Sequence, residues 1–429
     1  MWKFLPILLL SAACTGSVPE HPDLSSFLVT INPDSFPELA KGELLDVPTA
    51  PMRATVDVQA IGREGEAVSW DGLGWLKVRP GRISGSNRVE IKDGVATEVE
   101  VEFVYTWGEA RIWVEDRGEI DEPGTFAVGV TDPLPFELPT VADVQRPSTV
   151  DYGDESCFSP WGFEPDCAGL SGDFVRMRGM DQGRRLMVTN VTTDGFYASD
   201  LDSPPGNYGS IFAFNFSRPR VEVGDLLSFL SGNVAEFIGF TELNYPVWDT
   251  ASSGHVLPDP IDISAALSSS GATSDEQRNA FLERYESSRV MIPDALFAAD
   301  LFDEETYYSF AQWPVRVPGI TGAEFTIISQ YEAPQFDPLC WKDTMADTSM
   351  GPIVGHLRHI GPANPEWVID LDGPYSFHSN VRDSDCWTGG TQRNGVRSSG
   401  PRLSQDYYYR DLPSCSGMPF DVEDQHLHR

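Results

Sequence analysis

The chain has 429 residues, a formal net charge of -35, and 11 Trp and 24 Phe. This aromatic content excludes a disordered chain, and the length predicts two to four domains. The charge disfavours nucleic acid as a partner, since a polyanion would be repelled at long range. It suits either solubility in a salty exterior or divalent-cation binding by carboxylate clusters. The 38 Gly and 33 Pro favour short strands joined by turns over long helices.

Residues 1–14 have the order of an export signal. Lys3 precedes an apolar run, residues 4–10, that is too short to span a bilayer, and small residues then lead to Cys14. The segment resembles a bacterial lipoprotein signal, which implies that Cys14 is lipidated and becomes the new N-terminus. The family pattern has Leu three residues before the Cys, where this chain has Ser11. An ordinary secretory signal cleaved just before Cys14 is therefore the alternative, and both interpretations predict export.

Residues 15–26 are polar and contain two prolines, which predicts a tether. A β-sandwich is predicted over residues 27–131. The stretches ATVDVQAI and ATEVEVEFVY alternate apolar and polar residues, and the turn at Asp93-Gly94 precedes the second. Strict period two indicates strands with one buried face. The pattern resembles the Ig-like domains of bacterial surface proteins.

Residues 132–171 are predicted to be a linker that contains a disulfide loop. Export makes the cysteines disulfide candidates, and Cys157 and Cys167 are close enough in sequence to close a small loop. Two of the other three can pair, and the sequence does not choose which two. A zinc site is disfavoured because the sequence contains no C-x-x-C spacing. The other three cysteines after the signal are Cys340, Cys386 and Cys415.

Residues 172–249 contain short β-rich runs separated by Gly, Asp and Pro turn residues, as in an antiparallel barrel. The stretches VTNVTTDGFYASD, GSIFAFNF and VEVGDLLSFLSGNVAEFIGFTEL resemble an OB-fold-like module. Such modules occur in bacterial lipoproteins and in the accessory region of extracellular nucleases. In those nucleases a separate domain carries the catalytic metal site, and its motif is not found in this sequence. The resemblance implies a β-barrel with an accessory, non-catalytic role.

Two sets of residues in this module are candidate binding residues. Related nuclease modules have an Asp-rich loop at the corresponding place, which suggests Ca²⁺, although the spacing matches no EF-hand and a solvated hairpin loop is the alternative. The candidate metal ligands are Asp194, Asp200, Asp202 and Asn207. OB-folds also bind oligonucleotides or oligosaccharides on a basic, aromatic sheet face. The candidate residues for such a face are Arg176, Arg178, Phe196 and Tyr197.

Residues 250–376 are predicted to be a second, decorated β-unit with one helix. Ser274 and Gln277 have the spacing of a capping box at the start of that helix. The stretch GPIVGHLRHIGPANPEWVIDL resembles a β-hairpin in the second half of the same nuclease-associated region. A divergent copy of the OB-like module is one interpretation of this unit. Residues 377–429 lose period-two patterning, which predicts an extended, Cys-containing tail.

No catalytic motif is found, and the protein is expected not to be an enzyme. The sequence lacks G-x-S-x-G, a Walker A motif and H-E-x-x-H. His356 and His359 lie in a strand-like run, where positions i and i+3 point to opposite faces, so we expect two unrelated histidines. His426 and His428 are expected to be solvent-exposed.

We therefore expect a mainly β, non-enzymatic binding or scaffolding lipoprotein, anchored to the bacterial outer membrane or cell surface. A periplasmic or secreted protein is the alternative location. The expected partners are the membrane, through the N-terminal lipid, and an envelope protein or a glycan, whereas the charge disfavours nucleic acid. No cofactor is expected apart from the Ca²⁺ considered above. The alternative function is an accessory nucleic-acid- or glycan-binding subunit of an extracellular nuclease or hydrolase.

Overall fold

The computed structural model describes residues 24–118, 124–148, 167–329, 335–346, 348–360 and 366–387, with Ala333 and the backbone of 158–159 and 162–163. Strands make up 43% of the structure and helices 17%, which confirms the mainly β class. Within the described ranges no helix has both the length and the apolarity needed to cross a membrane. The predicted signal with Cys14, together with Cys157 and Cys415, lies outside the described residues.

The chain divides into two compact units. The first contains the chain up to residue 186, with 227–236 and 241–251, and the second contains 187–226, 237–240 and the chain from 252 onward.

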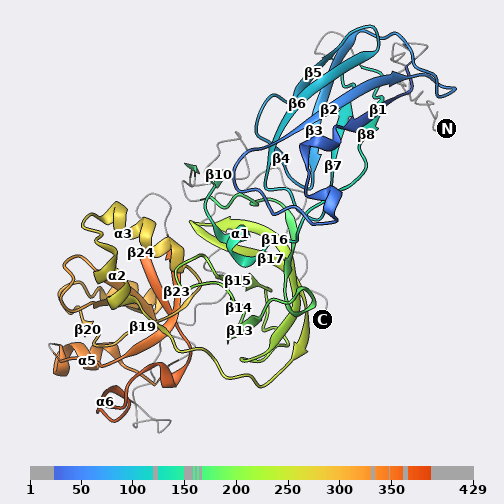
Figure 1. Ribbon diagram of the computed structural model, residues 1–429. Coiled ribbons are helices and arrows are strands. Elements are labelled where there is room, and N and C mark those ends of the chain that lie inside the picture. Colours follow the sequence, from blue (N-terminus) through green and yellow to red (C-terminus); the bar gives the residue numbers. More distant parts are fainter. Residues whose placement is uncertain are drawn as a thin grey trace, which may run out of the picture. The chain divides into compact units, whose positions relative to one another are not determined.

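A β-sandwich opens the first unit and is drawn in blue to cyan in Figure 1. One antiparallel sheet has the order β1-β2-β6-β4 and the other the order β5-β3-β7-β8, with β9 pairing β7. Their side chains alternate as predicted, because Val56 and Val58 of β2 face the core while Asp57 faces solvent. The strands are β1 (Ser26–Ile31), β2 (Met52–Ile61), β3 (Gly72–Arg79), β4 (Arg82–Ile83), β5 (Arg88–Ile91), β6 (Val95–Val104), β7 (Glu109–Glu115), β8 (Val128–Val130) and β9 (Leu134–Pro135).

The segment predicted as a linker contains ordered structure. Helix α1 (Val141–Gln145) has a capping box, in which Thr140 and Asp143 bond reciprocally, and Val141 and Val144 are buried. The short strands β10 (Phe158–Ser159) and β11 (Gly162–Phe163) pair with each other. Cys167 is disulfide-bonded, and its partner lies outside the described residues.

A six-stranded sheet follows in the order β12-β16-β13-β14-β15-β17. Because β16 also pairs with β17, five of the strands close into the barrel that the sequence predicted. The strands are β12 (Phe174–Arg178), β13 (Leu186–Val191), β14 (Gly195–Asp200), β15 (Ser210–Phe214), β16 (Leu226–Phe237) and β17 (Phe240–Ser252). A two-residue turn joins β16 to β17, with φ of 57° at Ile238 and 86° at Gly239. Two-residue hairpin turns of this kind favour glycine.

The second unit also contains a seven-stranded mixed sheet, in the order β18-β19-β23-β24-β22-β21-β20. The pairs β18–β19 and β22–β24 are parallel. This topology differs from a closed five-stranded barrel, so the interpretation as a copy of the OB-like module is wrong. The strands are β18 (Ile261–Asp262), β19 (Arg289–Ile292), β20 (Leu296–Phe297), β21 (Gln312–Arg316), β22 (Glu324–Ile328), β23 (Ile353–Ile360) and β24 (Glu366–Leu371).

Several helices accompany this sheet, whereas the sequence predicted one. Ser274 and Gln277 do form the predicted capping box, at the start of α3. Helices α2, α4 and α5 begin at the acidic caps Asp262, Asp303 and Asp337, and α6 begins at His378, but these helices are too short for helical periodicity to reveal them. They are α2 (Ile263–Ser270), α3 (Asp275–Leu282), α4 (Glu304–Phe310), α5 (Pro338–Met345) and α6 (Ser379–Arg382).

The first residues beyond 376 belong to the core of this unit. Phe377 is 2% exposed and packs against Trp313 and Phe336. Cys386 forms a disulfide with Cys340 of α5, which resolves the pairing that the sequence left open. The predicted tail therefore does not begin at residue 377, and residues 388–429 lie outside the described residues.

Candidate metal centre

The four residues predicted to bind Ca²⁺ do not form one site. Asp194 precedes β14 and Asp200 ends it, and an extended strand of this length places its ends about 20 Å apart. The Asp194 carboxylate accepts a hydrogen bond from the Thr192 hydroxyl at 2.8 Å. That of Asp200 accepts one from the backbone N–H of Asp202 at 3.0 Å. A single ion cannot reach both ends of β14, so this predicted ligand set, which also included Asn207, is wrong.

The predicted ligand face is also not an exposed basic, aromatic surface. Phe196 and Tyr197 are both fully buried, because β14 is covered on both faces. Arg176 is exposed but pairs with Asp181 at 2.5 Å. Arg178 pairs with Glu137 at 2.7 Å. The two aromatic residues therefore offer no ring surface to a base or a sugar.

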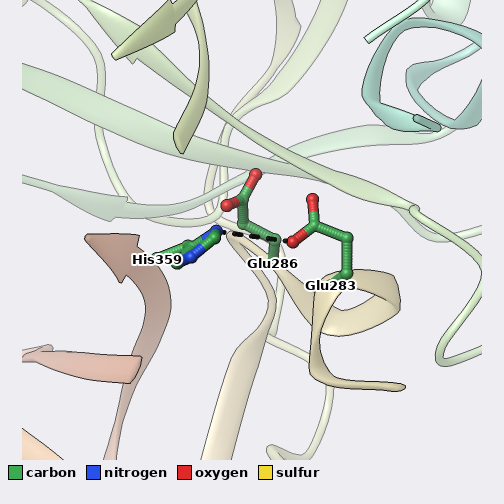
Figure 2. Close-up of side chains that lie close together, drawn as sticks. All are labelled: Glu283, Glu286 and His359. Atoms are coloured by element: carbon green, nitrogen blue, oxygen red, sulfur yellow. Dashed lines mark ion pairs between the residues drawn. The ribbon is translucent and has the colours of Figure 1, made fainter. Parts of the chain in front are cut away.

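Three other ionisable side chains meet inside the second unit. Glu283, Glu286 and His359 each offer one ligand atom, and these atoms lie within 4.8 Å of one another. The residues are 3%, 0% and 2% exposed, respectively. Figure 2 shows the two carboxylates and the imidazole pointing toward one another. The Nδ1 atom of His359 lies 3.6 Å from Oε2 of Glu283.

The two carboxylates are brought together by a 3₁₀ turn at the end of α3. Glu283 begins this turn, and the backbone N–H of Glu286 donates to the carbonyl of Glu283 at 3.2 Å. Side chains at i and i+3 eclipse each other in a 3₁₀ turn. The sequence Glu-Arg-Tyr-Glu therefore places both carboxylates on one side of the turn.

The backbone after Glu286 fixes the turn against strand β23. Ser287 has φ of 60°, a conformation that costs free energy in a residue with a side chain. Its N–H donates to the carbonyl of Leu357 at 2.8 Å, and the N–H of Leu357 donates to the carbonyl of Ser288 at 3.0 Å. Since His359 is two residues beyond Leu357, these bonds hold the carboxylates beside the imidazole.

Complete burial makes the charge of this cluster costly. Each ionised carboxylate loses its hydration, and the two repel each other. Neither ring nitrogen of His359 has a hydrogen-bond partner among the described residues. A divalent cation would offset the repulsion between the carboxylates and supply a partner for one nitrogen. Ligands of a tetrahedral transition-metal ion lie about 3.4 Å apart, close to the 3.6 Å between His359 and Glu283, and all three ligand atoms lie within 4.8 Å of one another.

A second buried network lies on the other face of β23. Nε2 of His356 lies 2.8 Å from the hydroxyl of Thr189, and Nδ1 lies 2.8 Å from Asp372. Arg289 donates to Asp372 at 2.6 Å. This confirms that His356 and His359 face opposite sides of a strand. Thr189, His356 and Asp372 resemble a nucleophile, a base and an orienting acid, but Thr189 is 1% exposed and His356 is fully buried. The hydroxyl is therefore sealed from any substrate.

Asp372 is expected to stabilise the second unit by about 2 kcal/mol, since it accepts charge-assisted hydrogen bonds. Burial acts to raise the pKa of Asp372, but His356 and Arg289 hold that pKa below its usual 3.8. A lowered pKa means that the contribution is present above pH 3.8 and is lost as the pH falls through the lower, folded value. The free energy of unfolding, measured in urea, should therefore be lower in Asp372→Asn than in the parent protein at pH 7. This difference should be smaller at pH 3.

The exposed Asp300 provides the control for this prediction, because Asp300→Asn is expected to change stability little at either pH. An Asp372→Asn variant as stable as the parent at pH 7 would contradict the assigned role.

No protein-family model, no curated protein and no solved structure matches this chain. The sequence did not predict Glu283 or Glu286 as metal ligands, and it predicted that His359 is unrelated to His356.

Proposed function

We propose that this chain is an exported, non-enzymatic binding protein whose second unit holds a divalent transition-metal ion at Glu283, Glu286 and His359. The observation that carries the proposal is the environment of the His359 imidazole. The residue is 2% exposed, neither ring nitrogen has a hydrogen-bond partner in the described parts of the chain, and the ring is aimed at two buried carboxylates. Folding removes the water that would satisfy these nitrogens, and a bound ion offsets this cost at one of them.

The donor set favours a transition metal over Ca²⁺. Zn²⁺, Mn²⁺ and Fe²⁺ accept imidazole together with carboxylate, whereas Ca²⁺ takes six to eight oxygen ligands. The three side chains supply too few oxygens for Ca²⁺ and include a nitrogen. Burial of all three favours a structural role for the ion, which would join the turn after α3 to strand β23.

The proposed location rests on two features. The N-terminal segment resembles a lipoprotein signal, and the Cys340–Cys386 disulfide is of the kind that forms in oxidising compartments. Anchoring through Cys14 at the outer membrane or cell surface belongs to the same proposal, as does an envelope protein or glycan as partner.

Metal binding is tested on the full chain after treatment with a chelator. Elemental analysis after dialysis against Zn²⁺ should find one bound ion per chain, and isothermal titration should find much weaker binding of Ca²⁺. His359→Ala should lose this ion. Thiol reductants are omitted because free cysteines bind zinc. His426→Ala/His428→Ala serves as the parent, so that this second histidine pair does not contribute. Zinc binding that is absent, or that survives His359→Ala unchanged, would overturn the proposal.

A further inference from the structure

The turn between β16 and β17 lies directly against the imidazole of His359. A Cβ atom built on Gly239 would lie 3.0 Å from Cε1, 3.1 Å from Nδ1 and 3.5 Å from Nε2 of that ring. These are the three atoms of the edge through which histidine binds metals. The backbone of Gly239 is therefore packed against the coordinating edge, and both residues belong to the second unit.

The ring is held from a second direction by β24. His359 and Trp367 are partners in the β23–β24 register, and their rings stack with centroids 4.8 Å apart and planes 18° from parallel. The indole N–H of Trp367 donates to Asn279 of α3 at 3.0 Å. The stack restrains the plane of the imidazole, and the backbone of Gly239 lies beside its edge. Together they leave Nδ1 facing Glu283.

We propose that Gly239 is a positioning residue of the metal centre, and that the ion binds Nδ1 of His359. The inference rests on the proposed function. Gly239 has no side chain, so no Cβ atom stands beside Nδ1, where the ion would bind. An alanine methyl at this position would stand 3.1 Å from Nδ1, closer than nine in ten real contacts of a Cβ atom, and the ring or the turn would have to shift by a few tenths of an ångström. The ion would then lose the aligned nitrogen.

The test compares two glycines with similar backbones. Gly319 has φ of 80°, and a Cβ atom there would meet nothing within 4 Å, whereas Gly239 has φ of 86° and a Cβ atom there would meet the ring. Gly239→Ala and Gly319→Ala should therefore lower the melting temperature of the metal-free protein through similar backbone strain. Only Gly239→Ala should weaken Zn²⁺ binding, by at least about 10-fold, as is typical when the support of a metal ligand is lost. It should also shift the visible absorption bands of bound Co²⁺.

Gly239→Asn covers the case in which the alanine variant does not fold. Asparagine tolerates positive φ better than alanine but still places a Cβ against the ring. Normal Zn²⁺ affinity and an unchanged Co²⁺ spectrum in the folded variant would overturn the inference, as would equal weakening in Gly319→Ala. If the wild type binds no ion, or binds it independently of His359, the proposed function fails as well. If His359→Ala loses the ion while the Gly239 variants bind normally, only this inference fails.

Discussion

Replacing Glu286 by Gln is expected to stabilise the metal-free protein and to destabilise the metal-loaded protein. Without an ion, the fully buried Glu286 carboxylate lies beside a second carboxylate, that of Glu283. The neutral amide has nearly the same shape, removes the repulsion and is cheaper to desolvate. We expect the free energy of unfolding of the metal-free variant to rise by about 1 kcal/mol.

The metal-loaded state responds in the opposite direction because the ion loses an anionic ligand. With Zn²⁺ at 100 times the wild-type Kd, binding stabilises the native state by about 2.7 kcal/mol. A variant with a 100-fold weaker Kd would keep about 0.4 kcal/mol of this at the same Zn²⁺ concentration. Urea unfolding followed by tryptophan fluorescence, with a chelator or with Zn²⁺, measures both values.

Glu276→Gln is the matched control, since Glu276 is an exposed acid in the first turn of α3, the helix that leads to Glu283. It is expected to change little in either state. The reversal of sign distinguishes a metal centre from a polar cluster that only supports the fold. If Glu286→Gln destabilises the protein equally with and without Zn²⁺, the cluster is not a metal site.

The sandwich was predictable because its strands are solvated on one face. Val56, Asp57 and Val58 alternate between core and solvent, and this pattern is visible in the sequence without any partner strand. In the barrel the same reasoning failed for Phe196 and Tyr197. Four successive residues of β14 are buried, so alternation does not identify an exposed face there. Turn residues still revealed the strands, but not what covers them.

The candidate metal centre was not predictable from the sequence, although the orientation of its histidine on β23 was. Period two predicted that His356 and His359 separate to opposite faces of β23. Glu283 and Glu286 are two of 65 acidic residues, and their spacing matters only because the chain forms a 3₁₀ turn there. Their meeting with His359 depends on the backbone bonds between Ser287, Ser288 and Leu357, which are contacts distant in sequence. Local propensity carries no information about such contacts.

Loss of the Cys340–Cys386 disulfide is expected to lower the free energy of unfolding of the second unit by about 4 kcal/mol, since the bond closes a loop with a sequence separation of 46 residues. Without it, the unfolded chain gains the conformational freedom that the crosslink removes.

The crosslinked segments also pack together, because Phe336 beside α5 contacts Phe377, and Cys386 is 1% exposed. The Cys340→Ser/Cys386→Ser variant is compared with the parent by urea unfolding in the presence of a chelator, so that zinc does not contribute. Hydrogen exchange in β23 and β24 reports on the second unit specifically. A thiol reductant should lower the free energy of unfolding of this unit in the parent by the same amount. It should cause no further decrease in this unit of the variant. A difference below about 1 kcal/mol would mean that aromatic packing alone holds α5 and α6 to the sheet, and that the crosslink adds little to it.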